Sequence, residues 1–303
     1  MPIGETATVE SISPTAQHVG PKSGIVWIAS YPKSGNTWVR GFLHNLMRLN
    51  NGERGEQDIN DMARFSTWEL DKKRYAHFLG LEPDNFKHRG EIAATRHHVH
   101  QQIADSTEGV VFIKTHNSLV MDRGYSTINF TVTAGAVYVV RSPLDIAISY
   151  AHHSGSSIDA TIERMAATDV ETDGTETAVY EVHGSWSQHV WSWTRNPHRA
   201  LYVVRYEDML ANPQKAFEAM AQHLHLASTR QDLVRAIERS SFARLQMQER
   251  EKGFRERPPF ADQNFFREGR AGQWKEILAP AQIERIVRDH GEQMHRFGYL
   301  PLG

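Results

Sequence analysis

The chain of 303 residues contains no cysteine, so disulfide bonds and thiolate chemistry are excluded. It also lacks an excess of either charge, since 34 Lys and Arg residues stand against 36 Asp and Glu residues. With a formal net charge of −2, neither nucleic acid nor an anionic membrane is an expected partner. Any site for an anion must therefore be a local concentration of lysine and arginine.

Long apolar runs are also lacking. No stretch approaches the roughly 18 apolar residues that cross a bilayer. Residues 1–24 are rich in Ser, Thr, Pro and Gly and lack the basic start and apolar run of a secretory signal. We expect 1–24 to be a disordered tail and the protein to reside in the cytoplasm. No repeat or shift in composition marks a second domain, so we expect residues 25–303 to form a single domain.

Four short apolar runs end in polar or basic residues: Ile25–Ala29, Val110–Lys114, Ala136–Arg141 and Ala200–Tyr206. They do not alternate cleanly, which is typical of strands that are buried on both faces of a parallel sheet. Helical periodicity predicts helices over Val39–Asn50, Pro143–His153, Ile158–Ala167, Ser185–Arg195, Gln214–His225, Thr229–Glu238 and Pro280–Arg296. This alternation predicts a three-layer α/β fold with a central, mostly parallel sheet flanked by helices.

The segment Ser-Tyr-Pro-Lys-Ser-Gly-Asn-Thr-Trp joins the first strand to the first helix, which is the arrangement that binds phosphate or sulfate. Backbone N–H groups around Ser34, Gly35 and Asn36 would point into the turn. Lys33 adds a positive charge, and Thr37 either caps the helix or donates its hydroxyl. The loop departs from the Walker A pattern because its lysine precedes the glycine, and no Gly-Lys-Ser/Thr ending is present to hold magnesium.

Two further strands end in residues that suit a ligand site, because open α/β sheets bind ligands at the carboxyl ends of their strands. His116 follows the second strand, although a lone histidine there is more often structural. The third strand ends in Arg141, where a Walker B strand would carry the Asp that holds magnesium, so an anion is favoured over a metal. The closely spaced residues His97, His98 and His100 lack nearby carboxylate or Cys ligands, and this favours a polar loop over a metal site.

A cationic, glycine-containing segment lies near the end of the chain. Residues 266–275 read Phe-Arg-Glu-Gly-Arg-Ala-Gly-Gln-Trp-Lys. Two glycines beside two arginines make a flexible loop whose backbone can close on a phosphate.

In their order from about Ile25 to Lys275, these motifs resemble those of the PAPS-dependent sulfotransferases (PAPS is 3′-phosphoadenylyl sulfate). The first loop is similar to the family's 5′-phosphosulfate loop, Lys-Thr-His at 114–116 to its base segment, and the last segment to its Arg-x-Gly-x-x-Gly-x-Trp signature. Arg141, followed eight residues later by Ser149, resembles the 3′-phosphate motif. The chain looks like a bacterial-like member with a cytosolic-type sulfotransferase domain. The resemblance implies a P-loop-like fold, PAPS as cofactor, PAP as product and no metal.

By the same resemblance His116 removes the proton of an acceptor hydroxyl that attacks sulfur in line, while Lys33 and Lys114 stabilise the developing charge. Tyr206 and the pair Ser240 and Phe242 match segments that line the adenine pocket. The cofactor-binding residues implied are Lys33, Ser34, Gly35, Asn36, Thr37, Trp38, Arg141, Ser149, Tyr206, Ser240, Phe242, Arg267, Glu268 and Gly269.

The chain departs from the family pattern at two places. Glu268 stands where many relatives have a basic residue, so only its N–H would help an anion, and Arg270 is a candidate to compensate. Ala279–Pro280 replace the Thr-Val of the stretch through which animal relatives dimerise. If the protein is a homodimer, we expect it to pair through another surface.

Two alternatives to this enzyme remain at the level of sequence. A P-loop kinase or NTPase-like phosphotransferase would require magnesium, and a nucleotide-sensing protein would dispense with His116. The resemblance implies that the acceptor is a small molecule with a hydroxyl, such as a phenol, an alcohol or a natural product. We expect its walls to come from residues 51–105 and 154–184, which are polar and irregular and long for plain connections.

Overall fold

The computed structural model describes residues 23–257 and 264–301. Its centre is a parallel five-stranded sheet in the order β2-β3-β1-β6-β7. The strands are β1 (Gly24–Ser30), β2 (Ser66–Trp68), β3 (Val110–Thr115), β6 (Thr133–Val140) and β7 (Leu201–Arg205). A separate antiparallel hairpin is formed by β4 (Met121–Asp122) and β5 (Tyr125–Ser126). The predicted α/β fold with a central, mostly parallel sheet is confirmed.

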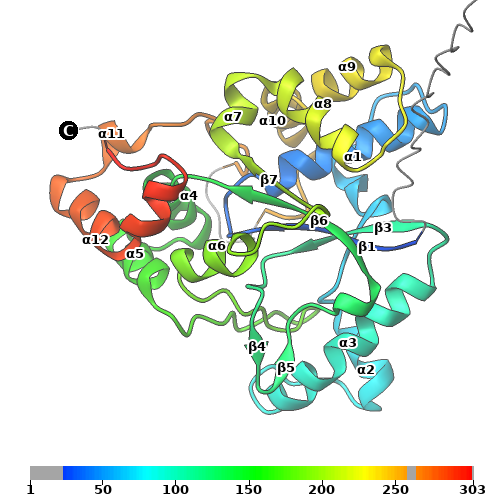
Figure 1. Ribbon diagram of the computed structural model, residues 1–303, viewed down its shortest axis with the longest axis horizontal. Coiled ribbons are helices and arrows are strands. Elements are labelled where there is room, and N and C mark those ends of the chain that lie inside the picture. The colour runs from blue at the N-terminus through cyan, green and yellow to red at the C-terminus, as the bar shows by residue number, and fades with distance from the viewer. Residues whose placement is uncertain (1–22, 258–263, 302–303) are drawn as a thin grey trace, which may run out of the picture.

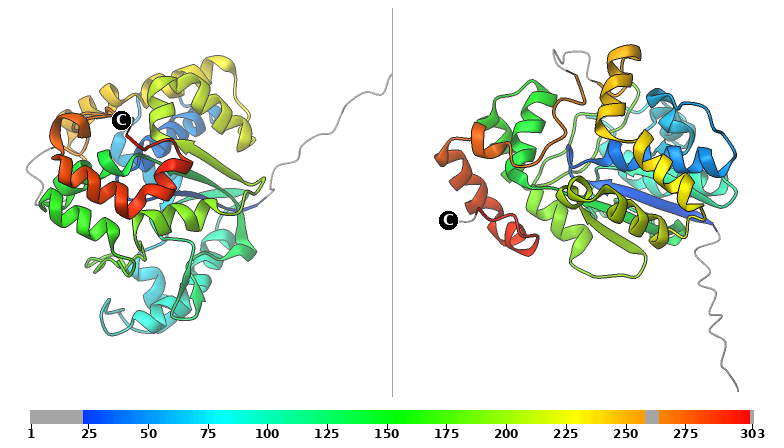
Figure 2. Two further views of the ribbon diagram at one scale, coloured as in Figure 1. Left: turned by 60° about the vertical axis from the view of Figure 1, so that its left-hand side comes forward. Right: turned by 90° about the horizontal axis from the view of Figure 1, so that it is seen from above.

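The sheet is apolar on both faces, because successive residues of β1 point to opposite sides. Ile25 and Trp27 belong to one buried cluster, and Val26 and Ile28 to the other. The second cluster is covered by α1 (Asn36–Asn50), α7 (Tyr206–Ala211), α8 (Pro213–His223) and α9 (Arg230–Arg239). These helices lie together on one side of the sheet in Figure 1, and both views of Figure 2 keep α1 beside the yellow helices.

The opposite face is covered by helices from three parts of the chain. They are α3 (Arg89–Asp105), α4 (Pro143–Ser154), α5 (Ile158–Ala166), α6 (Trp186–Thr194) and α12 (Pro280–Arg296). The remaining elements are the 3-10 helices η1 (Ile59–Arg64) and η2 (Phe130–Val132) and the helices α2 (Lys72–Leu79), α10 (Phe242–Lys252) and α11 (Trp274–Ile277). The seven predicted helices α1, α4, α5, α6, α8, α9 and α12 are present, with ends that differ by at most a few residues.

The description of residues 51–105 as irregular is wrong. This segment contains η1, β2, α2 and the 17-residue α3. The apolar pattern of α3 is interrupted by polar residues that are nevertheless buried: Arg96 pairs with Asp122 at 3.0 Å, and His100 Nε2 lies 2.5 Å from a carboxylate oxygen of Glu69. His97, His98 and His100 therefore lie on a helix and not in a loop, and a buried carboxylate contacts one of them.

Three smaller differences concern the ends of the chain and its connections. Gly24, expected in the tail, is the first residue of β1, while the expectation for 1–22 lies outside the described residues. Tyr206 begins α7 instead of ending a strand, and α10 and α11 were not expected. Within the described ranges, no helix combines the length and apolar composition needed to span a membrane.

Candidate active site

The loop between β1 and α1 has the backbone that its glycine requires. Gly35 is the N-cap of α1 in the left-handed region, with φ 108°. A Cβ at this residue would lie 2.7 Å from the Tyr206 ring, so only glycine fits. The Asn36 side chain donates to Ile28 O at 2.8 Å and thereby ties the loop to β1. The first N–H groups of an α-helix have no acceptor within the helix, so the start of α1 can bind an anion through Asn36 and Thr37, whereas the Trp38 N–H already donates to Gly35 O at 3.0 Å. Thr37 lies in that turn and is not the cap.

The loop opens onto a cavity of about 350 Å³. Most of the residues proposed from sequence line it: Lys33, Gly35, Asn36, Thr37, Trp38, Lys114, His116, Arg141, Ser149, Tyr206, Phe242, Arg267, Glu268 and Gly269. Two do not. Ser34 is buried in the turn, where its N–H donates to Tyr31 O at 3.3 Å, and Ser240 is fully buried, with its hydroxyl donating to Ile237 O at 3.1 Å.

Lys33 is one of the cations that line the cavity. Its Nζ lies 4.0 Å from the centroid of the Phe265 ring. Burial, and then the nearby charges of Arg141 and Lys114, lower the pKa of Lys33 to about 7, against a smaller opposing effect of Glu256. The ammonium therefore lacks enough negative charge around it, as expected for a group that binds an anion.

His116 is held in one orientation by its surroundings. Its Nδ1 lies 2.7 Å from Ser30 O, and because a carbonyl oxygen only accepts, Nδ1 carries the proton. Its Nε2 is then the basic atom. The backbone N–H of His116 donates to Glu181 at 3.1 Å, and its carbonyl accepts from His189 Nε2 at 3.1 Å. Burial, followed by the charge of Lys114, lowers the pKa of His116 to about 3, so the ring is neutral at physiological pH.

Lys114 forms an ion pair with Glu256, a carboxylate that the motifs did not indicate. Glu256 lies 3.7 Å from Lys114 Nζ and 2.6 Å from Arg40 Nη1. Burial would raise the pKa of Glu256, but Arg40 and Lys114 outweigh it and hold this pKa at about 2. Arg40 itself is buried in α1 and donates through Nε to Ser66 at 3.0 Å. The cavity thus contains an ionised carboxylate between two cations.

Arg141, directly after β6, is buried and forms no ion pair with a carboxylate among the described residues. Its guanidinium donates to Lys33 O at 3.0 Å and to Arg270 O at 3.2 Å, and it lies 4.3 Å from the centroid of the Tyr206 ring. Its Nε has no hydrogen-bond partner in the part of the chain that the structure describes. A buried cation with unused donors is a suitable site for a phosphate.

Residues 266–269, in the C-terminal glycine-containing segment, line the cavity beside Phe242. Gly269 has φ 60°, and a Cβ there would lie 2.3 Å from the Phe242 ring, so this contact requires glycine. Arg267 donates to Glu268 at 2.7 Å and to Gln273 at 2.5 Å. Glu268 also binds Arg270 at 2.5 Å. Glu268 therefore occupies one nitrogen of each neighbouring arginine.

Arg270, the candidate to compensate for Glu268, has its guanidinium occupied by carboxylates. A second carboxylate, Glu276, binds it through two contacts of 2.9 Å, and Arg270 is not among the residues that line the cavity. Its carbonyl, which accepts from Arg141, is its contribution to the site.

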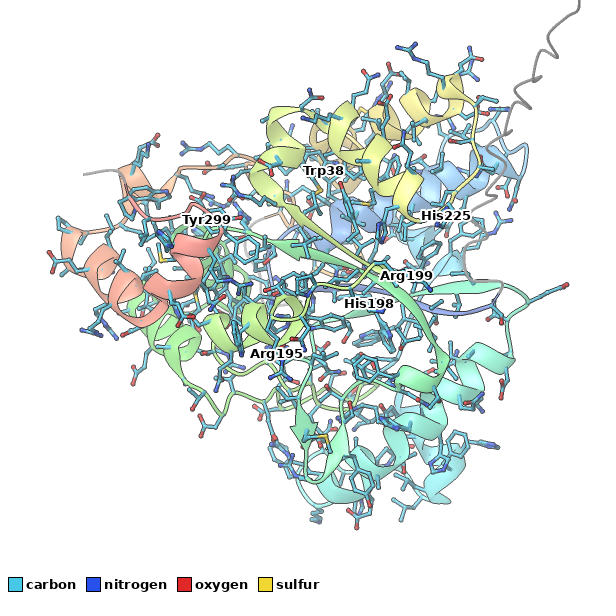
Figure 3. The ribbon with its side chains drawn as sticks, in the orientation of Figure 1. Trp38, Arg195, His198, Arg199, His225 and Tyr299 are labelled. Carbon is cyan, nitrogen blue, oxygen red and sulfur yellow. The ribbon has the colours of Figure 1, made fainter. Side chains whose placement is uncertain are left out.

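Aromatic rings gather around the start of α1. Trp38, labelled in Figure 3, packs against Tyr206 with ring centroids 5.9 Å apart and against Phe217 at 5.4 Å. Phe242 packs against Phe266 at 6.0 Å. Trp38, Tyr206 and Phe242 all line the cavity, which makes this end of it suitable for a purine.

Residues 154–184, expected to help form the acceptor walls, contribute Thr172, Glu181 and His183, and His153 lines the cavity from the end of α4. Among the lining residues that had no signal in the sequence are Tyr150, in α4, and Glu256, in the segment after α10. Residues 51–105, expected to help form the acceptor walls, contribute none of the lining residues. Among the described side chains, no group of three or more His, Asp or Glu is arranged to hold a metal ion.

Comparison with known proteins identifies the family. The family model of the sulfotransferase domain matches residues 24–298. The chain is 25% identical over 284 residues to Sulfotransferase 1A1 of Canis lupus familiaris, covering 89% of this chain and 83% of that one. It is also 25% identical over 277 residues to Cytosolic sulfotransferase 16 of Arabidopsis thaliana, covering 86% and 72%.

Solved structures show the same fold. Mouse sulfotransferase SULT7A1 complexed with PAP matches with a TM-score of 0.58 at 18% identity, covering 91% of this chain and 86% of that one. A retinol dehydratase in a complex with retinol and PAP matches with a TM-score of 0.59 at 16% identity, covering 91% and 82%. By the family match over nearly its whole length, the chain belongs to the sulfotransferase domain family.

Proposed function

We propose that the protein transfers the sulfuryl group of PAPS to a hydroxyl of a small-molecule acceptor, with His116 as the general base. The observation that carries this proposal is the hydrogen bond from His116 Nδ1 to Ser30 O, which leaves Nε2 unprotonated in a cavity that also contains Lys33 and Lys114. A neutral imidazole beside two cations suits proton removal from a hydroxyl while an anion is bound.

The donor would be held by backbone N–H groups and by the cations of the cavity. The start of α1 and Lys33 would bind the 5′-phosphosulfate, while Arg141, Ser149 and Arg267 would bind the 3′-phosphate. Trp38, Tyr206 and Phe242 would enclose the adenine. PAP bound in the mouse SULT7A1 structure supports this type of ligand. Ser34 and Ser240 would contribute through packing, since their side chains are buried outside the cavity and their N–H groups donate to Tyr31 O and Ala236 O.

The acceptor oxygen forms a bond to sulfur as the bond from sulfur to the bridging phosphate oxygen breaks, and its proton goes to His116 Nε2. Lys33 stabilises the negative charge that develops on the bridging oxygen, and Lys114 lies beside the transferring group. Bound anionic donor raises the pKa of His116 from its value in the empty site, which strengthens the base.

The kinase reading is not favoured. The family assignment opposes it, and the strand that would supply a magnesium-binding Asp ends in Arg141. The relatives named cytosolic sulfotransferases support a cytoplasmic location, which we propose together with a small-molecule acceptor as the reaction partner.

Transfer of labelled sulfate from PAPS to a panel of phenols and alcohols tests this proposal. We expect His116→Ala to lower kcat by about 10²–10⁴-fold while PAP affinity is kept, and Lys33→Ala to lower it by about 10²–10³-fold. His98→Ala, on the exposed surface of α3, is the matched control and should keep full activity. Undiminished turnover in His116→Ala would refute the base, and magnesium-dependent phosphate transfer from ATP would favour a kinase.

A further inference from the structure

Glu181 is a cavity carboxylate to which no motif assigned a role. It lies between α5 and α6, and one of its oxygens accepts the backbone N–H of His116, the proposed base, at 3.1 Å. Among the described residues it forms no ion pair with a lysine or arginine. Glu256 differs in this respect, because Arg40 and Lys114 already bind it. The charge of Glu181 is therefore not paired with a permanent cation.

The backbone around Glu181 is fixed to the segment that carries His116. The N–H of the next residue, Val182, donates to the Asn117 side chain at 2.8 Å. The N–H of Glu181 itself donates to the Thr172 hydroxyl at 2.8 Å, and its carbonyl accepts the N–H of Thr172 at 2.9 Å. These hydrogen bonds hold Glu181 in place on both sides, so its carboxylate stays beside the base.

Proton uptake by His116 creates a positive charge close to that of Lys114. Nδ1 already carries a proton, which Ser30 O accepts at 2.7 Å, so protonation of Nε2 makes the ring an imidazolium. Burial and then the charge of Lys114 disfavour this cation and lower the pKa of His116. The carboxylate of Glu181 has the largest opposing effect. The imidazolium therefore needs a counter-charge, and Glu181 is placed to provide it.

The carboxylate of Glu181 is ionised. Burial would raise its pKa, but the hydrogen bond with His183 and the electrostatic effects of His116 and Lys114 outweigh burial and hold this pKa at about 2. The second oxygen of Glu181 lies 3.4 Å from His183 Nε2. The titratable groups near His116, in the part of the chain that the structure describes, are Lys114, His153, Glu181, His183, His189 and Glu256. Since Glu256 already has two cations, Glu181 is the carboxylate of this group that is available to His116.

We propose that Glu181 is the counter-ion of His116 and stabilises the imidazolium that forms when Nε2 takes the proton of the acceptor hydroxyl. This inference rests on the proposed function, which assigns that proton to His116. In this step the acceptor oxygen gives up its proton, the ring changes from neutral to positive, and Glu181 stays a carboxylate and receives no proton. Glu181 is thus a positioning residue that acts through His116, by its charge and by its hydrogen bond to the N–H.

Glu181→Gln tests the charge alone, because its amide oxygen can still accept the N–H of His116. The measurement is the titration of the His116 ring by NMR in the PAP complex, with the His116→Ala spectrum to identify its signals. We expect the wild-type ring to titrate above about pH 4, since bound phosphates favour the imidazolium. In Glu181→Gln the pKa of His116 should be lower by about one pH unit, and Glu181→Asp should lie between the two. Glu176→Gln, the same change at an exposed position of the same segment, should leave the titration unchanged.

Single-turnover rates of sulfate transfer from PAPS give a second readout. We expect Glu181→Gln to be about three- to tenfold slower with phenol, and to lose less with 4-nitrophenol, which is more acidic and depends less on a base. Its affinity for PAP should not weaken, because a negative charge has been removed from a site that binds an anion. A merely structural role would instead slow both acceptors equally and weaken PAP binding.

An unchanged pKa of His116 in Glu181→Gln would overturn the inference, as would a wild-type ring that stays neutral down to about pH 4 in the complex. Equal slowing of the two acceptors would also overturn it, because the loss would then not depend on the proton. If the wild type transfers sulfate to neither acceptor, the proposed function fails, while the titration still decides whether Glu181 is the counter-ion. If the wild type transfers sulfate and the titration is the same in both proteins, only the inference fails.

Discussion

At the scale of single residues, the charge of Lys33 controls whether the empty site can receive an anion. Its pKa of about 7 means that the ammonium is present below this pH and is lost as pH rises through it. The pH dependence of kcat/KM reports groups of the free enzyme. We therefore expect kcat/KM for PAPS to fall above about pH 7, with loss of the Lys33 charge as the cause.

Lys33→Arg is the control for this prediction, because a guanidinium stays charged throughout the range. Its rate should be lower, since the geometry changes, but the alkaline decline should be absent. Steady-state kinetics from pH 5.5 to 9 would measure both profiles. An identical decline in the two proteins would assign it to another group.

Glu268 lowers the capacity of the neighbouring arginines to bind phosphate. It contacts Arg267 at 2.7 Å and Arg270 at 2.5 Å. Both pairs are partly exposed, so the effect of removing this charge is modest. We expect Glu268→Gln to tighten PAP binding by about two- to fivefold, measured by calorimetry, and to leave the affinity for AMP unchanged because AMP lacks the 3′-phosphate.

Glu276→Gln is the matched control, since Glu276 contacts Arg270 at 2.9 Å and does not line the cavity. PAP affinity should not change in this variant. Weaker PAP binding in Glu268→Gln would show that this carboxylate orients Arg267 toward the ligand instead of competing with it.

Some residues of the cavity could be predicted from the sequence and others could not. Lys33, His116 and Arg141 follow strand ends, and local order along the chain is enough to bring them to one edge of the sheet. Glu256 lines the same cavity without any signal in the sequence, and for His183 the sequence indicated only the segment 154–184 and not the residue. Their contacts depend on how the chain folds back over the sheet, and nothing in the local sequence encodes that path.

At the scale of elements, α4 holds the C-terminal segment through one buried carboxylate. Asp145, in the first turn of α4, accepts the N–H of Gly272 at 2.7 Å and that of Trp274 at 3.2 Å. We expect Asp145→Ala to lower the free energy of unfolding by about 1–3 kcal/mol, because it leaves two backbone donors unpaired. It should also weaken PAP binding, because Gly269 and Arg267 lie on the segment that Asp145 anchors.

Denaturant unfolding and PAP titration of the same preparation measure the two effects. Asp145→Asn, which keeps one accepting oxygen, should lie between the wild type and Asp145→Ala in both. A loss of stability with unchanged PAP affinity would mean that the segment keeps its position without this anchor.

The helix α3 shows why element prediction failed where it did. Regular apolar spacing predicts a helix when polar residues stay on the surface. In α3 the buried face includes Arg96 and His100, whose partners Asp122 and Glu69 lie elsewhere in the chain. Such pairs hide the periodicity of α3. In contrast, α12 has a polar outer face and Pro280 at its start, and both of its predicted ends, Pro280 and Arg296, agree with the structure.

At the scale of the whole molecule, the cavity joins segments that are far apart in the sequence. The β1–α1 loop, residues 141–153 and residues 265–273 contribute its cationic and aromatic walls, and a nucleotide bound there would link all three. Ligand at 100 times its dissociation constant stabilises the native state by about 2.7 kcal/mol. We therefore expect saturating PAP to slow amide hydrogen exchange in residues 31–38, 141–149 and 264–273, and to leave α3 unchanged unless exchange there requires global unfolding.

AMP, without the 3′-phosphate, should protect 31–38 but affect 264–273 less, since Arg267 then has no ligand group to bind. Mass spectrometry of peptic fragments would measure these differences, and uniform protection by both nucleotides would refute the assignment of the C-terminal segment to the 3′-phosphate.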